Sequence, residues 1–518
     1  MGSMDMREKA VVIGAGMGGL AAAIRLAAMG LSVTVIEASA SPGGKARAVP
    51  SAAGPVDTGP TVLTMRGVFD ALFALGGQRL EDHIHLIPQT ILARHWWSNS
   101  PTLDLFPQRE ANVEAIRAFA GPREADAFAR FDRLSAALFE TFDAPMMQAA
   151  RPDLAQIARQ SLARPRLWPA LLPGMTVQRL LRLHFRDPRL VQLFARYATY
   201  VGGRPGRSPG VLALIWQAEA AGVWAVGGGM HSLAAALARL AEGMGVTFRY
   251  GTQARRILRQ GGHVTGVEVE GAPPLACSVC VFNGDPGALQ SGLLGDSAQA
   301  ALPAKAAPRS LSAYVWAFAA KPHGPPLVHH NVFFTDTPKA EFGPIGRGQM
   351  PIEPTLYICA QDRGATAPAG LERFEIIVNA PAGARAYPEE VAQCHTRTFQ
   401  RLQAMGLTFS PTPEAASLTT PAQLSQLYPG SQGAIYGRSP EGLMAAFQRP
   451  QARTALPGLY LVGGGVHPGA GVPMAALSAR HAAEAISTDL TSGSKSMPTA
   501  TPGGMSTASR MTVRAPSR

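Results

Sequence analysis

The segment from Ala10 to Gly19 constrains the fold of this chain more than any other part of the sequence. A short β-branched run, typical of a buried parallel strand, precedes Gly14, Gly16 and Gly19, which have the spacing G-x-G-x-x-G. The first glycine permits a tight turn, the second lets backbone approach a pyrophosphate, and the third lets a helix pack closely on a strand. Apolar residues at helical spacing then indicate a helix that ends at Gly30. We therefore predict a dinucleotide site at the N-terminus of this helix.

An acid follows the next strand at the position where a ribose would lie. Residues 32–36 have the pattern of a strand, and Glu37 comes directly after them, near the expected offset of roughly 20 residues from the glycines. A carboxylate there hydrogen-bonds ribose hydroxyls and disfavours a 2′-phosphate, which argues against NADP. A tight turn without any ligand explains the glycines poorly, because glycine weakens the start of a helix.

Three further segments resemble those of a known family. Gly43, Gly44 and Lys45 form a second glycine turn, and Asp57-Thr58-Gly59-Pro60 follows it. Residues 459–473 match the pattern L-Y-x-V-G-x-G-x-H-P-G-x-G-x-P. On these segments the chain is identified as a member of the bacterial carotenoid (phytoene) desaturases, within the wider group of amine-oxidase-like flavoproteins. The resemblance covers about residues 8–488, and Val226 departs from it, since many relatives have proline there.

The resemblance implies FAD as the cofactor and assigns its contacts to both ends of the chain. The expected contacts near the first turn are Gly14, Ala15, Gly16, Gly18, Gly19, Glu37 and Ala38. Those in the second turn and the segment after it are Gly44, Lys45, Arg47, Gly59, Pro60 and Thr61. Those in the closing segment are Gly464, Gly465, Val466, Val472, Pro473 and Met474. The two ends are therefore expected to hold one cofactor between them.

The expected fold class is α/β, with a Rossmann-like FAD-binding domain that is discontinuous in sequence and an inserted α+β substrate-binding domain. The FAD-binding domain is expected at 8–70, 225–290 and 415–490. The inserted domain is expected at 71–224, mainly helical, and at 291–414, with strands near 312–319 and 374–378. Residues 491–518 are rich in Ser, Thr, Pro and Gly and are expected to be disordered.

Residues 59–73 most resemble the 1-hydroxycarotenoid 3,4-desaturases. The resemblance implies a C3–C4 double bond introduced into acyclic 1-hydroxy or 1-methoxy carotenoids such as 1-hydroxyneurosporene, on the way to spheroidene and spirilloxanthin in purple phototrophic bacteria. No side chain accepts a hydride, so the flavin would take it while a proton leaves the neighbouring carbon. The substrate hydroxyl requires a buried polar partner, which the sequence does not identify.

Other roles stay open at this level. No catalytic residue is assigned, and the electron acceptor is oxygen, a quinone or another carrier. His467 either contacts the substrate or flavin, or is a turn histidine bonded to backbone. The alternatives are a phytoene or neurosporene desaturase, or a carotenoid isomerase or oxygenase of the same family. An amine oxidase usually has an aromatic pair around its flavin, and the closing segment offers only Tyr460. A non-catalytic flavin- or lipid-binding chaperone is the alternative from another class.

Charge and hydropathy bear on where the protein acts. The net charge is +12, and arginines mixed with leucine and tryptophan gather between residues 151 and 200. This mixture suits the surface of an anionic membrane or, equally, two surface helices with a solvated basic face. Nucleic acid is not an expected partner, because no recognised motif accompanies the charge. No window of about 18 uncharged apolar residues exists, and no secretory leader is seen, so we expect peripheral association with the cytoplasmic side of the inner or photosynthetic membrane.

The four cysteines do not indicate a metal site. Cys277 and Cys280 form a C-x-x-C, but they lie in the apolar, strand-like run 275–282 and have no second pair. Buried strand residues are the better interpretation, and no metal is expected. Four cysteines in 518 residues suit a reducing compartment.

Overall fold

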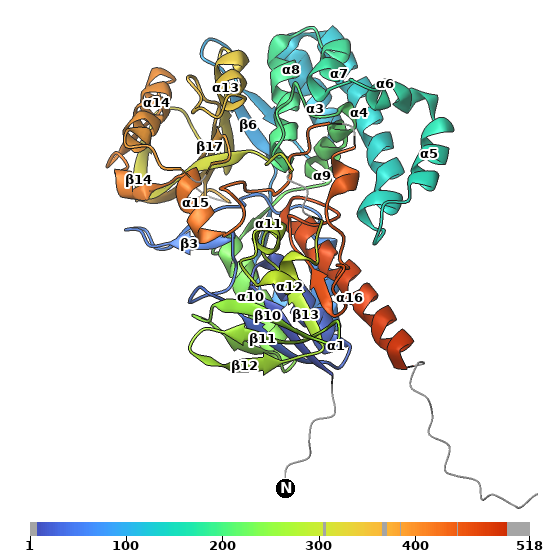
Figure 1. Cartoon of the computed structure of the whole chain (residues 1–518). Coiled ribbons are helices and arrows are strands. Elements are labelled where there is room, and N and C mark those ends of the chain that lie inside the picture. The colour runs from blue at the N-terminus through green and yellow to red at the C-terminus, as the bar shows by residue number, and fades with distance from the viewer. Residues whose placement is uncertain (1–7, 304–306, 365–369, 384, 443, 495–518) are drawn as a thin grey trace, which may run out of the picture.

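The computed structural model describes residues 8–303, 307–364, 370–383, 385–442 and 444–494. The molecule has a lower lobe built on a parallel sheet and an upper lobe that joins a mixed sheet to a group of helices (Figure 1). The chain starts in the lower lobe, passes through the upper lobe and returns to the lower lobe in α16 (Val472–Ser494). Segments far apart in sequence therefore meet where the lobes join.

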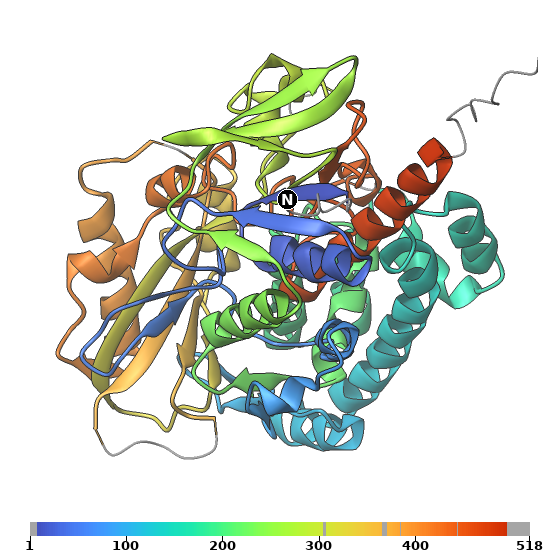
Figure 2. The same cartoon turned by 90° about the horizontal axis from the view of Figure 1, so that it is seen from below.

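The parallel sheet is formed by strands from both ends and the middle of the chain. Its order is β20 (Leu459–Leu461), β13 (Val279–Phe282), β1 (Lys9–Ile13), β2 (Ser32–Ile36) and β9 (Thr247–Arg249). Alternate residues of β1 enter different cores: Val12 packs with the helices α1 (Met17–Ala28), α10 (Met230–Gly243) and α16, and Val11 packs with a three-stranded sheet. Figure 2 shows the parallel sheet between these two layers. The strand–helix–strand unit predicted from the first glycines is confirmed.

The three-stranded sheet covers the face of the parallel sheet that the helices leave free. Its strands are β10 (Ala254–Gln260), β11 (His263–Val269) and β12 (Ala272–Ala276), all antiparallel. In β11, Val264, Val267 and Val269 are buried. Short helices α11 (Pro286–Gln290) and α12 (Asp296–Gln299) follow β13.

The mixed sheet of the upper lobe has eight strands, seven of them in one row. The row is β18 (Thr408–Ser410), β14 (Ser312–His323), β17 (Glu372–Ala380), β16 (Leu356–Ala360), β15 (His330–Phe333), β6 (Ala93–Trp96) and β7 (Leu103–Leu105), and β19 (Leu418–Thr419) pairs with β14. Helices α13 (Pro338–Ile345) and α14 (Glu390–Ala404) belong to the same part of the lobe. Two short antiparallel pairs lie outside these sheets: β3 (Arg47–Val49) with β4 (Val56–Thr58), which contacts β14 and β17, and β5 (Leu86–Pro88) with β8 (Trp224–Val226).

The helical part of the upper lobe packs around a cluster of aromatic rings. Its helices are α3 (Arg109–Ala120), α4 (Pro122–Phe142), α5 (Leu154–Leu162), α6 (Trp168–Leu171), α7 (Val177–His184), α8 (Pro188–Ala195) and α9 (Ile215–Ala220). Phe128, Phe131, Phe194 and Trp216 are almost fully buried within this group. Within the described residues, no helix combines the length and apolar composition that crossing a bilayer would require.

The structure differs from the expected boundaries at three places. The boundary at residue 70 falls inside α2 (Gly67–Leu75), and Phe73, Leu80 and Ile84 are buried in the core of the lower lobe, because the apolar face of α2 packs on α1 and α16. β19 lies beyond residue 415 yet extends the mixed sheet, and α15 (Pro421–Leu427) also packs on β14. Helix α16 continues to Ser494, into the segment expected to be disordered; residues 495–518 lie outside the described residues.

Near its C-terminal end, α16 carries threonine and serine side chains that bond to its own backbone. The hydroxyls of Thr491 and Ser492 donate to the carbonyls of Ser487 and Thr488 in the preceding turn. Such bonds satisfy polar side chains within a helix that composition alone would not favour. The run 275–282 also differs from expectation, since it forms two strands: Cys277 lies between β12 and β13, and Cys280 lies within β13.

Candidate functional site

The first glycine turn has the geometry that a pyrophosphate requires. Gly14 has a φ of +98°, and its N–H donates to the carbonyl of Ile36 at 2.8 Å. A Cβ on Gly19 would lie 2.0 Å from the carbonyl oxygen of Gly14, so α1 approaches β1 as closely as glycine allows. No side chain caps α1 at Gly16, which leaves its first N–H groups and its positive dipole end for an anion.

Glu37 lies beside this turn at the carboxyl end of β2. One carboxylate oxygen accepts a hydrogen bond from the N–H of Ala15 at 2.7 Å, and the other accepts one from the N–H of Ser39 at 2.8 Å. The two bonds orient the carboxylate next to the glycines. Ala38 lies between Glu37 and Ser39 in the sequence. This arrangement fits the ribose acid of a dinucleotide site.

The second glycine turn packs against the first. Gly43 forms a bridge with Gly16, and a Cβ on Gly44 would lie 3.1 Å from the Cα of Gly16. Gly59 follows nearby at a φ of +145°, where a Cβ would lie 2.0 Å from the carbonyl oxygen of Lys45. The segment that carries Gly59, Pro60 and Thr61 is therefore held against the turn by backbone contact.

The two basic residues of this turn reach the C-terminal part of the chain. The Lys45 ammonium donates to the carbonyl of Ile435 at 2.6 Å, and its burial lowers the pKa of Lys45. The Arg47 guanidinium donates to the hydroxyl of Thr419 at 2.8 Å. Both side chains thus join the second turn to residues 419–435, and their contacts with FAD remain predictions.

The closing segment lies directly against the first turn. A Cβ on Gly18 would lie 2.8 Å from the backbone nitrogen of Gly463 and 2.7 Å from the side-chain oxygen of Asn283. The Gly463 N–H donates to the hydroxyl of Ser478 in α16, and the Asn283 amide donates to the Gly14 carbonyl. Both ends of the chain and the end of β13 therefore converge on one point, as the paired glycine motifs predicted.

A buried arginine holds the turn that follows β20. Arg449 donates to the carbonyls of Gly464 and Tyr436 at 2.9 and 3.1 Å, and to that of Arg438 at 3.2 Å. Burial lowers the pKa of Arg449 to about 10. Gly464, Gly465 and Val466 thus lie in a turn with fixed backbone, and their contacts with FAD also remain predictions.

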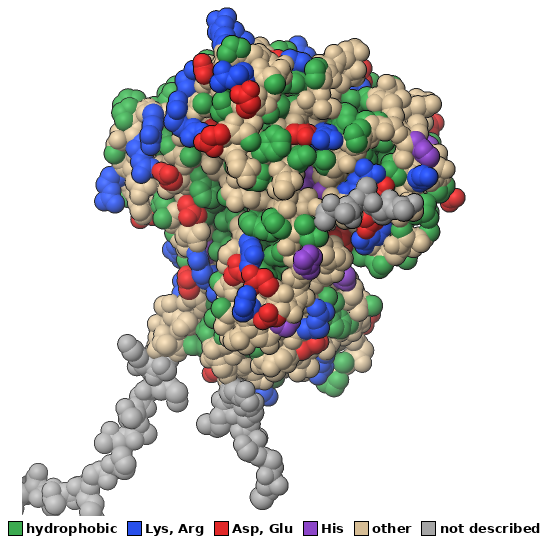
Figure 3. Space-filling view, turned by 180° about the vertical axis from the view of Figure 1, so that it is seen from behind, with side chains coloured by type: hydrophobic (Ala, Val, Ile, Leu, Met, Phe, Trp, Pro, Cys, Tyr) green, Lys and Arg blue, Asp and Glu red, His purple; other side chains and the backbone are tan. Residues whose placement is uncertain are grey.

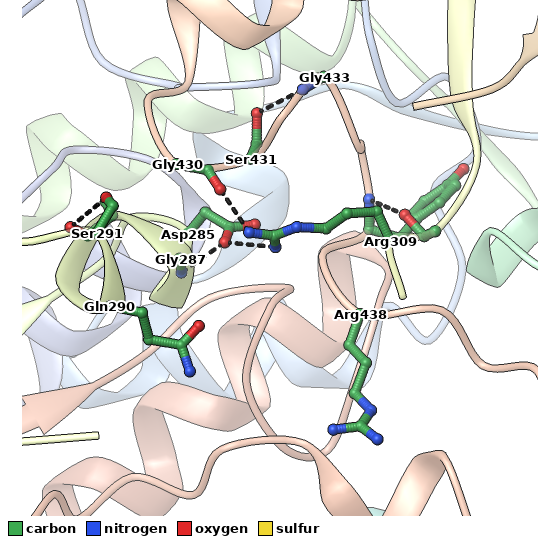
Figure 4. Close-up of polar contacts among 12 residues, drawn as sticks. Asp285, Gly287, Gln290, Ser291, Arg309, Gly430, Ser431, Gly433 and Arg438 are labelled. Carbon is green, nitrogen blue, oxygen red and sulfur yellow. Dashed lines mark hydrogen bonds and ion pairs between the residues drawn. The ribbon is translucent and has the colours of Figure 1, made fainter. Parts of the chain in front are cut away.

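A polar network beside α11 supports the same junction (Figure 4). The Asp285 carboxylate accepts hydrogen bonds from the Gly287 N–H at 2.8 Å and from Arg309 at 3.0 Å. Arg309 also donates to the carbonyl of Gly430 at 2.6 Å. Asp285 caps α11, so the sequence Asn283-x-Asp285-Pro286 marks the place where the chain leaves the parallel sheet.

One cavity of about 1720 Å³ runs from these segments into the upper lobe. Its lining includes six of the residues expected to contact the cofactor, namely Gly59, Pro60, Thr61, Val472, Pro473 and Met474. Most of the remaining wall is apolar, with contributions from α4, α5 and α8 and from the mixed sheet; examples are Phe139, Phe142, Met146, Ile157, Phe185, Val332 and Phe334. The glycine turns and the cavity lining together fit FAD, with its pyrophosphate at the glycine turns and its ring system at the cavity.

His467 does not face this cavity. Its ring Nε2 lies 2.8 Å from the carbonyl oxygen of Ala149, and the ring stacks on His481 with centroids 5.6 Å apart. Burial lowers the pKa of His467, so the neutral ring is favoured. The cavity lining from this segment begins at Pro468. The geometry favours the turn-histidine interpretation over contact with a substrate.

The polar side chains of the cavity wall were not predicted as site residues from the sequence, apart from Thr61. Arg196 and Glu219 form a buried pair there, next to Tyr200. The Tyr357 hydroxyl lies 2.7 Å from the Thr61 hydroxyl and 2.6 Å from Nδ1 of His330. Of these groups only Thr61 belonged to a segment predicted from the sequence, because the strands and helices that bring the others together are remote in sequence.

Comparisons with known proteins agree with this geometry. The family model described as flavin-containing amine oxidoreductase matches residues 17–487. The hydroxyneurosporene desaturase of Cereibacter sphaeroides is 63% identical over 489 residues, covering 94% of this chain and 99% of that protein. That of Rhodobacter capsulatus is 63% identical over 494 residues, covering 95% and 100%. A 1-hydroxycarotenoid 3,4-desaturase of Flavobacterium is 28% identical over 491 residues, covering 92% and 99%.

Solved structures share the fold at low sequence identity. An oxidoreductase from Methanosarcina mazei superimposes with a TM-score of 0.57 at 17% identity, covering 92% of this chain and 100% of that chain. A triple mutant of putrescine oxidase superimposes with a TM-score of 0.57 at 15% identity, covering 93% and 99%. At such identities the likeness concerns the fold alone.

Proposed function

The chain belongs to the family of flavin-containing amine oxidoreductases, and on that premise we propose that it desaturates the C3–C4 bond of acyclic 1-hydroxycarotenoids such as 1-hydroxyneurosporene. It is an FAD-dependent oxidoreductase whose relatives over nearly the full chain are hydroxyneurosporene desaturases. The observation that carries the proposal is the large, mostly apolar cavity whose lining includes residues expected to contact the flavin. A polyene fits such a cavity, whereas a small charged amine would leave most of its wall uncovered.

Bound FAD supplies the two-electron acceptor that no side chain can provide. The protein contributes binding and placement. The uncapped start of α1 receives the pyrophosphate, Glu37 receives a ribose, and Pro60 and Pro473 lie where the cavity meets the cofactor segments. The apolar wall excludes water and holds one carbon–carbon bond of the polyene at the flavin. Orientation of the substrate therefore accounts for much of the catalysis. A conjugated polyene spreads a developing positive charge, which makes a strong base less necessary.

The test is a flavin spectrum of the purified protein, followed under anaerobic conditions as 1-hydroxyneurosporene is added. We expect the flavin absorbance to bleach and the product to be two hydrogens lighter by mass spectrometry. Turnover of phytoene but not of 1-hydroxyneurosporene would instead identify a phytoene desaturase. A flavin that no carotenoid reduces would favour a binding protein without catalytic activity.

We also infer that the helical part of the upper lobe rests on the cytoplasmic surface of a membrane, where it takes up its substrate. The exposed apolar residues there are Leu154, Leu162, Trp168, Leu172 and Leu183, all about half exposed or more. Exposed arginines lie among them in α5 to α7, for example Arg159, Arg166, Arg179 and Arg182. Basic and apolar side chains also lie side by side across the upper lobe in Figure 3. Such a surface suits an interface with anionic lipid.

The same helices line the cavity, which connects the proposed lipid surface to the substrate site. Ser161, Leu171 and Arg182 belong to the cavity lining and lie next to the exposed apolar residues in sequence. A carotenoid dissolved in lipid would therefore enter the cavity between these helices. The four cysteines are free and buried, which suits the reducing cytoplasmic side.

Charge placed on this surface should weaken membrane binding. We expect Leu162→Glu to lower the fraction of protein that sediments with anionic phospholipid vesicles by roughly tenfold, because an apolar side chain is lost from the lipid. Leu427→Glu is the matched control, since Leu427 is an exposed leucine on α15, away from these helices. Equal sedimentation of the two variants would contradict the inference.

A further inference from the structure

A buried ion pair interrupts the apolar wall of the cavity. Arg196 and Glu219 are only 8% and 3% exposed, and Nη2 of Arg196 lies 3.4 Å from Oε1 of Glu219. The Tyr197 hydroxyl donates to the same carboxylate oxygen at 2.7 Å, and Arg196 donates to the hydroxyl of Tyr200. Arg196, Tyr200 and Glu219 line the cavity.

Fold stability does not account for this pair. Removing two charges from water costs several kcal/mol per ion in effect, and a pair repays that cost only with close contact and full hydrogen bonding. The distance of 3.4 Å is long for a charged hydrogen bond, and Nε of Arg196 has no acceptor among the described residues. A well-packed apolar pair would stabilise the fold at least as well. The buried pair of Arg196 and Glu219 is therefore better explained by a role in binding a ligand.

The pair lines the same cavity as the segment that is expected to bind the flavin. Thr61 belongs to that segment, and its hydroxyl lies 2.7 Å from the hydroxyl of Tyr357, which in turn lies 2.6 Å from Nδ1 of His330. Thr61, Tyr357 and Arg196 line the same cavity. Val62, which follows Thr61, packs with Tyr200 and Tyr357 against the apolar cluster that contains Tyr197.

The substrate chemistry demands a polar group at this place. In a 1-hydroxycarotenoid, the oxygen is on C1, and only two carbon–carbon bonds of about 1.5 Å each separate C1 from C3. If C3 and C4 are held at the flavin, the hydroxyl must lie beside the flavin-binding segment and not at the far end of the cavity. A hydroxyl both donates and accepts, so it needs a donor and an acceptor together.

We propose that Arg196, Tyr200 and Glu219 form the subsite that binds the C1 oxygen of the substrate, an inference that rests on the proposed desaturation of 1-hydroxycarotenoids. Arg196 and Tyr200 donate hydrogen bonds to the oxygen, and Glu219, which also orients Arg196, accepts the hydrogen of the substrate hydroxyl. Burial raises the pKa of Tyr200, so its hydroxyl keeps the proton that it donates. Tyr197 holds Glu219 from behind.

This subsite explains discrimination between two nearly identical substrates. Neurosporene lacks the hydroxyl, so its binding would bury the donors of Arg196 and Tyr200 without a new acceptor. Sites built to hydrogen-bond a hydroxyl reject analogues that lack it far more strongly than apolar pockets reject one extra methylene. The same three side chains would also set the register of the chain, which places C3 and C4 at the flavin.

The test compares the second-order rate constant of anaerobic flavin reduction by 1-hydroxyneurosporene with that by neurosporene. We expect the wild-type ratio to exceed roughly 100. Tyr200→Phe removes a single oxygen atom and should lower the ratio by roughly tenfold, mainly through the hydroxylated substrate. Arg196→Met combined with Glu219→Gln removes the charge pair without leaving one charge buried alone, and should lower the ratio further. Arg255→Met is the matched control, because Arg255 lies on β10 and forms an exposed ion pair with Glu270.

Each outcome separates the subsite from the proposed function. Failure of 1-hydroxyneurosporene to reduce the wild-type flavin would overturn the proposed function whatever the variants do. A wild-type preference for the hydroxylated substrate that Tyr200→Phe and the double variant leave unchanged would overturn the subsite alone. A parallel fall for both substrates would also overturn it, since it would indicate general damage. If the double variant does not retain flavin, Tyr200→Phe decides the question by itself.

Discussion

Gly19→Ala is expected to yield a protein that is purified without bound flavin. The added Cβ would lie 2.0 Å from the carbonyl oxygen of Gly14, a backbone atom that no side-chain rotation can move away. Either the turn opens or α1 shifts from β1, and both changes displace the N–H groups that receive the pyrophosphate. Because Gly19 is buried, overpacking at this site should also lower the free energy of unfolding by about 3 kcal/mol. The flavin absorbance per protein and the thermal unfolding midpoint measure the two effects.

Gly243→Ala is the matched control for this substitution. Gly243 is the last residue of α10, and a Cβ there would meet no atom within 4 Å. Alanine is favoured over glycine in a helix by about 1 kcal/mol, so this variant should keep its flavin and be no less stable than the wild type. A Gly19→Ala protein with the same flavin content as Gly243→Ala would show that the turn tolerates a wider approach of helix to strand than the structure indicates.

The second large effect is expected for Arg449→Met. Methionine roughly fills the space of the arginine stem but leaves the carbonyls of Tyr436, Arg438 and Gly464 without their donor. Each buried carbonyl that loses its partner costs about 1–3 kcal/mol, so the free energy of unfolding should fall by roughly 3 kcal/mol or more. Since Gly464 lies in the turn that is expected to contact FAD, the variant should also release flavin more readily during dilution or gel filtration.

A surface arginine of the same type provides the comparison. Arg453 pairs with Asp489 at 3.0 Å, and both side chains are about 40% exposed. Exposed ion pairs contribute less than about 1 kcal/mol, so Arg453→Met should have a small effect on stability and none on flavin retention. Equal destabilisation of the two variants would mean that the Arg449 contacts contribute little beyond the packing of the side chain.

Local spacing predicted much of the cofactor site. The glycines at 14, 16 and 19, the strand at 32–36 and Glu37 lie as expected, because the turn, the helix start and the strand end are separated by few residues. Backbone geometry over such short distances depends mainly on the residues themselves. The closing pattern at 459–473 is equally local, since it spans β20, the turn after it and the start of α16. Domain boundaries were harder to predict, since the start of the substrate domain falls in a helix whose apolar face could have packed on either lobe.

The substrate site could not be predicted in this way. Arg196 and Glu219 are 23 positions apart and, in sequence, resemble ordinary charged residues near apolar helices; Thr61, His330 and Tyr357 come from distant segments. The contact of Lys45 could not be predicted either, since its buried ammonium donates to the carbonyl of Ile435, and the two residues are 390 positions apart. By itself the sequence determined the parallel nucleotide-binding unit and the pairing of the two chain ends, because those motifs depend on short-range backbone geometry. Only the tertiary structure decided which polar side chains share the apolar cavity, because that depends on how remote strands and helices pack together.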